Sequence, residues 1–416
     1  MTDKRDIIII GGGAIGLCSA YYLRKSGRGV TVIDSGKMEI GSSTGNAGLI
    51  SASHIIPLAA PGVVSTALKW MTDPTRSPFG MKFSLDPAYL GWLISFAASC
   101  NQANVDKVLE PLNALGRLSY DNFVRIIAEE NLDCSFSTKG SLVVYNTAGA
   151  FESGKEDMEL MQRFSIPVER LDAAAVKKKI PGVLDSVKGG YLTPGDAYMH
   201  PGKFFTGLKN KLREAGVEFI PDSPVRDFIR NGDSISQVAT ARGNYEAEDF
   251  VLCAGAWSGQ IGQMLNLKLP IQPARGYSMT MKKPAGGPDI SMILGERKTA
   301  VTPMGEFLRV TGRLEIGNFS TVPDPVWIKR IQAGVSEYLN LGEKPEVLET
   351  WAGLRPVSSD GYPAIGRPAK IPNLIIATGH AMLGLTYGTG TGQLVTEIAN
   401  ATKPTININP LTPNRF

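Results

Sequence analysis

DIIIIGGGAIGLCSAYYLRKSGRGVTVID, residues 6–34, places a glycine-rich turn and a helical pattern between two short apolar runs. Asp6–Ile10 has the pattern of a buried strand, and Leu17–Lys25 carries apolar residues at helical spacing. Gly27 ends that helix, and residues 30–34 form the next apolar run. A strand, a helix and a second strand within about thirty residues predict a βαβ unit.

The glycines of the turn have the spacing of a dinucleotide-binding fingerprint. Gly11 allows the tight turn, Gly13 lets the backbone approach a pyrophosphate, and Gly16 lets helix and strand pack closely. The helix start adds N–H groups and a positive dipole end. Asp34 follows Gly16 by eighteen residues, where a carboxylate accepts hydrogen bonds from a ribose. In this context the motif predicts a Rossmann-like nucleotide-binding domain rather than an ordinary glycine-rich turn.

The composition excludes several other classes of protein. A chain of 416 residues is long enough for two domains. Its net charge of +4, without a basic block interleaved with aromatic residues, argues against nucleic-acid binding. The four cysteines form no CxxC, which argues against a disulfide framework, a zinc site or a dithiol centre. The three histidines are too scattered to suggest a metal site, so we expect no metal, free thiols and a cytoplasmic location.

The sequence gives little indication of a membrane segment. The chain enters its first strand directly, so we expect no signal peptide. No apolar run reaches the roughly 18–20 residues that a spanning helix needs. Residues 85–100, LDPAYLGWLISFAASC, form the most lipid-like stretch. We interpret this stretch as a core helix, with a membrane-surface helix as the alternative.

Two further segments bear on the choice between NAD and FAD, which the fingerprint leaves open. Residues 41–51, GSSTGNAGLIS, form a second small-residue loop that suits a longer cofactor. Residues 388–392, GTGTG, open a helix after a strand, and a helix N-terminus stabilises an anionic reduced flavin. Each segment also fits ordinary turn chemistry, but together they favour FAD.

The middle of the chain has a different pattern of apolar and polar residues. Residues 216–257 read as strand, hairpin and strand, whereas residues 135–146 and 271–345 resemble antiparallel strands with alternating faces. We therefore expect an α/β fold, in which a Rossmann-like FAD-binding domain carries an inserted antiparallel-sheet (α+β) substrate domain. The predicted FAD-binding segments are 1–85, 148–270 and 346–416, and the predicted substrate-binding segments are 86–147 and 271–345.

The motifs along the chain resemble those of the D-amino-acid oxidase superfamily of flavoproteins, most closely its bacterial D-amino-acid dehydrogenase branch. The matching stretches run in order through nearly the whole chain: GGGAIG…VIDS, STGNAGLIS (43–51), APGVVSTALKWM (60–71), RGYSMTM (275–281), WAGLRPVSSDGYPAIGR (351–367) and TGHAMLGLTYGTGTGQL (378–394). PGDAYMHP (194–201) departs from this pattern and looks more like glycine oxidase and related amine oxidases.

The resemblance implies roles for individual residues. Arg355 matches the arginine that pairs with the substrate α-carboxylate; the alternative is a structural arginine paired with an acid such as Asp360. Tyr277 is a candidate hydroxyl for the same carboxylate or a core tyrosine, with Tyr387 a weaker candidate. His380 is expected to position cofactor or substrate, or to be a satisfied core histidine. The expected FAD contacts are Gly11, Gly13, Ala14, Ile15, Gly16, Asp34, Ser35, Ser43, Thr44, Asn46, Ala47, Gly48, Leu49, Val225, Ala254, Gly255, Gly384, Gly388, Thr389 and Gly390.

The resemblance also implies a reaction. A D-amino acid transfers a hydride from Cα to flavin N5, and the imino acid then hydrolyses to a keto acid and ammonia. We expect non-covalent FAD and a quinone-type electron acceptor, which leaves peripheral association with the inner membrane open. The alternatives are a D-proline or hydroxy-D-proline dehydrogenase acting on a cyclic imino acid, and a glycine- or sarcosine-type oxidase that uses oxygen. The side-chain specificity and the oligomeric state stay open.

Overall fold

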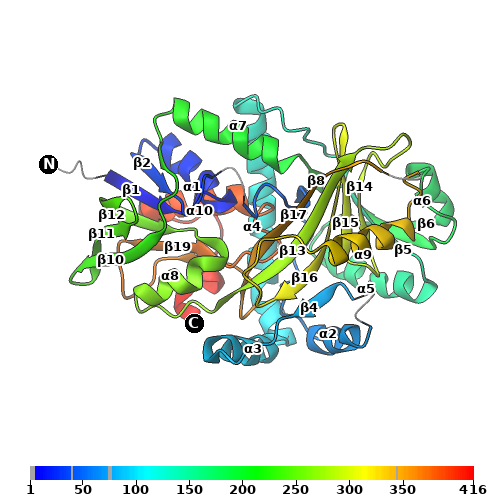
Figure 1. The fold of residues 1–416 in the computed structure, drawn as a ribbon, viewed down its shortest axis with the longest axis horizontal. Helices are drawn as coiled ribbons and strands as arrows, with labels where there is room; N and C mark the ends of the chain where they lie inside the picture. The colour runs from blue at the N-terminus through cyan, green and yellow to red at the C-terminus, as the bar shows by residue number, and fades with distance from the viewer. Residues whose placement is uncertain (1–4, 39–40, 74–76, 343–344) are drawn as a thin grey trace.

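The computed structural model describes residues 5–38, 41–73, 77–342 and 345–416. Two β-sheets lie side by side with helices packed around each of them, and the C-terminus lies on the side of the first sheet (Figure 1). The predicted combination of an α/β part and a second sheet is therefore confirmed.

The first sheet is mainly parallel and contains the βαβ unit. Its strands are β1 (Arg5–Ile10), β2 (Val30–Ile33), β9 (Glu218–Ile220), β10 (Val225–Asn231), β11 (Ser234–Thr240), β12 (Gly243–Leu252), β18 (Ala364–Gly366) and β19 (Leu374–Thr378). β1 pairs in parallel with β2 and with β12, and β12 pairs in parallel with β19. β10, β11 and the first half of β12 form the predicted antiparallel hairpin at one edge.

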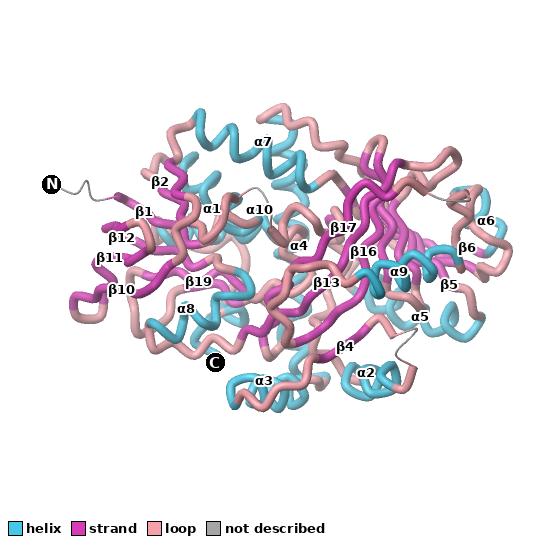
Figure 2. The backbone as a smooth tube through the Cα atoms, viewed as in Figure 1, coloured by secondary structure: helices cyan, strands magenta, loops and turns pink. Residues whose placement is uncertain are grey.

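Both faces of this sheet are covered. The helices on one face are α1 (Ala14–Lys25), α4 (Gln102–Glu129), α7 (Pro201–Glu214) and α10 (Gly388–Ala399), and α8 (Ser258–Met264) lies on the other (Figure 2). Ile7 and Ile9 of β1 pack among the residues of the four helices, whereas Ile8 and Ile10 pack on the side of α8 and the hairpin. A strand buried on both faces reads as a continuous apolar run, which explains the four isoleucines.

The second sheet is mostly antiparallel. Its strands are β4 (Phe79–Met81), β5 (Ser141–Tyr145), β6 (Glu169–Asp172), β7 (Gly189–Thr193), β13 (Ile271–Lys282), β14 (Ser291–Leu294), β15 (Thr299–Met304), β16 (Phe307–Ile316) and β17 (Val347–Ser358). The strand order is β17-β13-β16-β15-β14-β5-β7-β6, with β4 added in parallel to β16. A two-stranded pair, β3 (Leu49–Ile50) and β8 (Ala197–Tyr198), lies outside both sheets.

The two faces of the second sheet differ in chemistry. α6 (Ala173–Lys179) and α9 (Pro325–Ser336) cover an apolar face, and α5 (Ala148–Arg163) packs near β5 and β7 through Phe151. The apolar face carries Tyr277, Met279 and Val310. Because successive residues of a strand point to opposite faces, the other face carries the intervening positions, which are largely polar. This polar face holds the candidate active site.

The division between the two sheets differs from the predicted segments. β4, β6, β7 and β17 belong to the second sheet, although residues 79–81, 169–172, 189–193 and 347–358 fall in the predicted FAD-binding segments. Helix α4, predicted within the substrate segments, instead packs on the first sheet through Phe123 and Ile126. These strands pair with partners distant in sequence, and local pattern carries no information on such pairing.

The prediction of a core helix over residues 85–100 is wrong. The observed helix α3 (Pro87–Ser99) lies on the surface next to α2 (Val63–Met71) (Figure 1), and only its Tyr89 and Trp92 are buried. The Trp92 indole N–H donates to the carbonyl oxygen of Val357 at 3.1 Å, which anchors the helix on β17. Among the described residues, no helix is long and apolar enough to cross a membrane.

Candidate active site

The glycine-rich turn joins β1 to α1 with the predicted geometry. Gly11 has φ +109°, and a Cβ there would lie 2.5 Å from the carbonyl oxygen of Cys253. Gly16 likewise has no room for a Cβ against the carbonyl oxygen of Gly11. The turn therefore lies directly against the end of β12, which places the predicted pair Ala254 and Gly255 beside it.

The start of α1 is suited to an anion. Gly13 caps the helix, and the first-turn amides have no acceptor within the helix itself. The N–H of Ala14 donates to Oγ of Ser43 at 2.7 Å, so the second small-residue loop reaches the start of α1. Aligned amides and the positive end of the helix dipole bind phosphate, and the predicted residues Ile15 and Gly16 belong to this first turn.

Asp34 follows β2 directly, at a position whose carboxylate is suited to a ribose. Its carboxylate accepts hydrogen bonds from the N–H of Gly12 at 2.7 Å and of Gly36 at 2.8 Å. The N–H of Ser223 donates to the carbonyl oxygen of Asp34 at 2.8 Å, which brings the segment before Val225 alongside. The exposed Ser35 lies next to the carboxylate in the chain. These contacts bring the predicted residues Asp34, Ser35 and Val225 into one region.

The loop of residues 41–50 lies between α1 and the second sheet. Arg309, 3% exposed, donates from Nη1 to the carbonyl oxygens of Thr44 at 2.8 Å and Asn46 at 3.2 Å. Gly48, with φ +70°, lies against the carbonyl oxygen of Met199 and the Met304 side chain, without room for a Cβ. Arg309 was not among the predicted site residues, because its role depends on which strand faces the loop.

The remaining predicted cofactor residues of this loop form a hydrogen-bonded turn. Asn46 accepts from the N–H of Gly48 at 2.8 Å and donates to the carbonyl oxygen of Ser43 at 2.6 Å, which fixes the turn that contains Ala47. Leu49 opens β3, and its carbonyl oxygen accepts from the Thr386 hydroxyl at 3.3 Å. This contact joins the loop to the segment before α10, where Gly384 lies.

The predicted role of the GTGTG segment is only partly supported. Gly388 opens α10 and lies near Cys18 of α1, close to the glycine-rich turn. Thr389, however, is fully buried and donates from Oγ1 to the carbonyl oxygen of Ser119 in α4 at 2.7 Å. The N–H of Gly390 donates to the Ser119 hydroxyl at 3.1 Å. These two residues therefore hold α10 against α4 instead of facing the cofactor region.

Arg355 lies on the polar face of the second sheet, at the end of β17. Its guanidinium lies directly over Gly276 of β13, which has no room for a Cβ. Nη1 donates to the carbonyl oxygen of Arg313 at 2.9 Å, and no carboxylate is paired with Arg355 among the described residues. Burial lowers its pKa to about 10, so the group is still charged at neutral pH.

The acid named in the alternative, Asp360, is already paired with another arginine. The carboxylate of Asp360 is held by Arg415, whose Nε donates at 2.6 Å and whose Nη2 donates at 3.2 Å. Arg355 is half-buried, and an enclosed cation usually has an acid beside it. Its guanidinium is therefore available for an anion from outside the described chain.

A strained residue supports Arg355. Arg313 has φ +64° within β16, next to a register shift in the β13–β16 pairing. This conformation is unusual for a residue with a side chain and marks a site where the surroundings enforce strain. The Arg313 side chain donates from Nη1 to the carbonyl oxygens of Ser77 at 3.3 Å and Phe79 at 3.1 Å, and it stacks on the Trp327 ring.

Tyr277 is not brought to Arg355. Ala274 pairs with Arg355 and Gly276 with Gly353, so Tyr277 points to the opposite, apolar face. There it is fully buried, and its hydroxyl donates to Glu315 at 3.1 Å. The structure supports the reading of a core tyrosine and gives no support to a hydroxyl on the substrate carboxylate.

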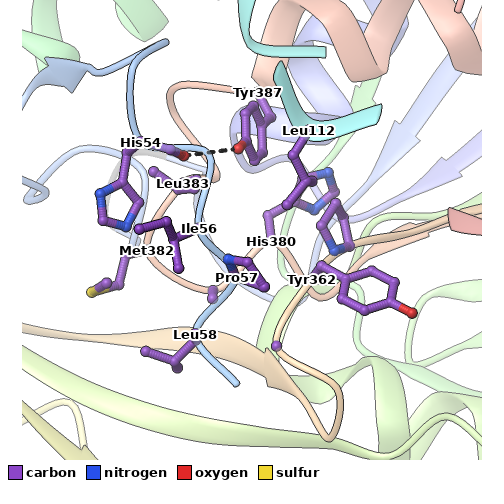
Figure 3. Close-up of a pocket in the computed structure, with 13 residues that line it drawn as sticks. His54, Ile56, Pro57, Leu58, Leu112, Tyr362, His380, Met382, Leu383 and Tyr387 are labelled. Carbon is purple, nitrogen blue, oxygen red and sulfur yellow. Dashed lines mark hydrogen bonds between the residues drawn. The ribbon is translucent and has the colours of Figure 1, made fainter. Parts of the chain in front are cut away.

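His380 is fully buried at the end of β19. Its Nε2 is 3.0 Å from the Thr391 hydroxyl, and burial lowers its pKa to about 3, so the ring stays neutral. It borders a cavity of about 20 Å³, room for one water, together with Tyr362 and Tyr387 (Figure 3). The Tyr387 hydroxyl donates to the carbonyl oxygen of His54 at 3.2 Å. The cavity has no room for an amino acid, and the hydroxyl contact of Tyr387 supports a core role for that residue. His380 differs from the expected satisfied core histidine, because its Nδ1 has no hydrogen-bond partner among the described residues.

The assembled groups fit FAD. The start of α1 suits the pyrophosphate, the Asp34 carboxylate suits the ribose, and the loop of residues 43–49 extends from α1 to the polar face of the second sheet. Ser43 and Asp34 contribute the hydroxyl and carboxylate oxygens that this cofactor would meet. An extended dinucleotide would thus run from Asp34 towards Arg355.

Comparisons with known proteins agree with this geometry. A family model described as FAD dependent oxidoreductase (DAO) matches residues 6–398. The D-amino acid dehydrogenase of Paramagnetospirillum magneticum is 31% identical over 417 residues, covering 99% of this chain and 98% of that protein. That of Agrobacterium fabrum is 30% identical, covering 99% of each chain. The structure of glycine oxidase from Geobacillus kaustophilus has a TM-score of 0.79 at 20% identity, covering 99% of each chain, and shows the same fold.

Proposed function

The chain belongs to the DAO family of FAD-dependent oxidoreductases, and from this premise we propose that it is a D-amino-acid dehydrogenase. The substrate loses a hydride from Cα and a proton from its amino group and becomes an imino acid, which water converts to a keto acid and ammonia. The names of the relatives that span almost the whole chain support this substrate class.

The observation that carries the proposal is the unpaired charge of Arg355. A guanidinium presents a planar fork that matches a carboxylate with two parallel hydrogen bonds. Arg313 engages one donor of this fork through its carbonyl oxygen, which limits the rotation of the group. An α-carboxylate held there would place the rest of an amino acid along the polar face of the second sheet.

The residues of this chain orient the substrate and need not supply a base. Bound FAD supplies the hydride acceptor. A substrate whose amino group is neutral can lose the Cα hydride without a protein base. His380 is buried and neutral, which agrees with such a mechanism. Orientation by Arg355 and exclusion of water would provide most of the rate acceleration.

We further propose that FAD is bound without a covalent link and that the acceptor is a quinone-type molecule rather than oxygen. The dehydrogenase relatives support the second statement, and a buried FAD loop held by hydrogen bonds is consistent with the first. Acid precipitation should release all yellow colour from the protein. Dye reduction without air should be faster than peroxide formation in air.

One experiment tests the proposed reaction. The purified holoenzyme is mixed under nitrogen with D-amino acids, their L-enantiomers, D-proline, hydroxy-D-proline, glycine and sarcosine, and the flavin absorbance is followed. We expect D-amino acids to bleach the flavin fastest. Fastest bleaching by cyclic imino acids, or by glycine and sarcosine, would replace the proposed substrate class by that one.

A further inference from the structure

The indole of Trp351 lies beside the guanidinium of Arg355 on the polar face of the second sheet. Gly276 of β13 and Gly353 of β17 are directly paired in this sheet. The guanidinium fills the position that a Cβ of Gly276 would take, and the Cζ2 and Cη2 atoms of Trp351 fill the same position at Gly353. Directly paired Cβ positions are about 4.5–5.5 Å apart, so the two side chains are neighbours over this pair of glycines.

The surroundings of the indole hold it in place. Its Cγ, Cδ2 and Cε2 atoms lie against Gly45 of the loop of residues 41–50, where a Cβ would overlap them. The same loop is fixed to the outer edge of β17, because the Ser42 hydroxyl donates to the carbonyl oxygen of Leu354 at 2.8 Å and accepts from its N–H at 2.9 Å. The ring of Trp351 is therefore held between the loop and the strand, and only part of it is exposed.

A substrate carboxylate bound to Arg355 brings the rest of the substrate next to Trp351. A Cα hydrogen that leaves as a hydride has to face the cofactor, so the amino group and the side chain face the protein. The Cζ2 and Cη2 atoms offer no hydrogen-bond acceptor, so an amino group against them would be left unsatisfied. An alkyl group packs against these carbon atoms without such a cost. The side chain is therefore the substituent that meets the indole.

We infer that Trp351 closes the pocket for the substrate side chain and restricts the enzyme to D-amino acids with small side chains. This inference rests on the proposed function. Because the ring is held by Gly45 and by β17, it cannot turn away from a longer side chain, and packed protein groups yield little to added volume. A methyl group fits beside the guanidinium, whereas the branched side chain of leucine reaches the ring.

Trp351→Phe tests the inference, since phenylalanine is shorter and leaves the position over Gly353 free. The ratio of kcat/KM for D-leucine to that for D-alanine should rise about tenfold, as expected for a change of methylene size in an apolar pocket. The kcat/KM for D-alanine and the FAD content should stay close to those of the wild type. An equal loss for both substrates, together with a lower Tm, would make Trp351 a purely structural residue.

Trp70→Phe is the matched control. Trp70 lies in α2, a surface helix in which no residue is buried. The same chemical change at this position should leave the ratio of D-leucine to D-alanine unchanged. A gain for N-methyl-D-alanine instead of D-leucine in Trp351→Phe would overturn the inference, because the amino group would then face the ring.

A second measurement needs neither turnover nor a variant. Propionate and 4-methylpentanoate correspond to alanine and leucine without the amino group, and the flavin absorbance of the oxidised holoenzyme reports their binding. The wild type should bind propionate more tightly, although the larger apolar surface of 4-methylpentanoate would otherwise favour the longer acid. Trp351→Phe should reverse this order.

The two levels of the proposal fail in different ways. Tighter binding of 4-methylpentanoate by a wild-type enzyme whose flavin is bleached by D-alanine would overturn the role of Trp351 alone. If no D-amino acid bleaches the wild-type flavin, the proposed function fails and the inference fails with it.

Discussion

Nη1 of Arg355 lies 2.9 Å from the carbonyl oxygen of Arg313, a residue whose backbone has the left-handed φ of +64°. Ser77, Phe79 and Trp327 hold the Arg313 side chain, so the strained backbone and the direction of its carbonyl are fixed together. One arginine thus sets the orientation of a second arginine through the main chain.

Arg355→Leu should lower kcat/KM for D-amino acids by roughly 10²–10⁴. The change removes a charge-assisted contact worth on the order of 3–5 kcal/mol and leaves a substrate carboxylate without a partner. Arg355→Lys should recover only part of the activity, because an ammonium lacks the planar fork. The FAD content of both variants, measured from their absorbance spectra, should stay normal. A folded Leu variant within a few-fold of wild type would make Arg355 a structural residue.

Arg313→Ala should raise KM for the amino acid about 5- to 30-fold, with a smaller change in kcat. The main-chain carbonyl is still present, but the contacts that hold it towards Arg355 are lost, at a cost of about 1–2 kcal/mol. Steady-state kinetics with a single D-amino acid measures this split. Lys298→Ala is the control, since Lys298 also has a positive φ but is exposed. An equal effect of both variants would mean that backbone strain alone is responsible.

Arg309→Gln should weaken FAD binding at least about tenfold. The variant loses charged donors to the carbonyl oxygens of Thr44 and Asn46, and a hydrogen bond from a charged group contributes roughly 1.5–3 kcal/mol. Titration of the apoprotein with FAD, followed by flavin fluorescence, gives the dissociation constant. Arg297→Gln is the control. It breaks an ion pair between Arg297, in the turn between β14 and β15, and Glu337, directly after α9, and it should leave the FAD affinity unchanged. A normal FAD affinity for Arg309→Gln would show that the loop holds its shape without this side chain.

The sequence predicted the parts of the fold that depend on neighbouring residues. The strand, turn and helix of residues 6–34 are a local pattern, and the structure confirms them. The role predicted for Arg355 came from the resemblance of its motif to a known family, and not from the spacing of apolar and polar residues. Tyr277 shows the limit of such reasoning, because the face to which a strand residue points depends on its pairing with a distant strand.

The same limit explains what was missed. Arg309 has no distinctive sequence context, and its contact with the loop of residues 41–50 appears only when β16 and that loop are placed together. The prediction of a core helix over residues 85–100 failed for a different reason. An apolar composition predicts burial, but the surface that covers a helix is a tertiary property, and α3 buries little more than Tyr89 and Trp92.

The buried carboxylate of Asp196 should make stability depend on pH. Asp196 is 2% exposed and accepts hydrogen bonds from the hydroxyls of Ser53 at 2.8 Å and Ser141 at 2.6 Å. Burial raises its pKa from 3.8 to about 6, against the opposing effect of these hydrogen bonds. A group whose pKa is higher in the folded state stabilises the fold fully below its unfolded pKa, and that stabilisation is lost as the pH rises through about 6.

The free energy of unfolding should therefore fall by roughly 2 kcal/mol between pH 4 and pH 7 from this group alone. Asp196→Asn should lack this component, so the difference in stability between variant and wild type should shift in favour of the variant as the pH rises. Urea unfolding of the holoenzyme at pH 4, 5, 6 and 7 measures the difference, with Asp233→Asn on the exposed hairpin turn as the control. A constant difference across this range would mean that the pKa of Asp196 is the same in the folded and unfolded protein, because the hydrogen bonds from Ser53 and Ser141 offset its burial.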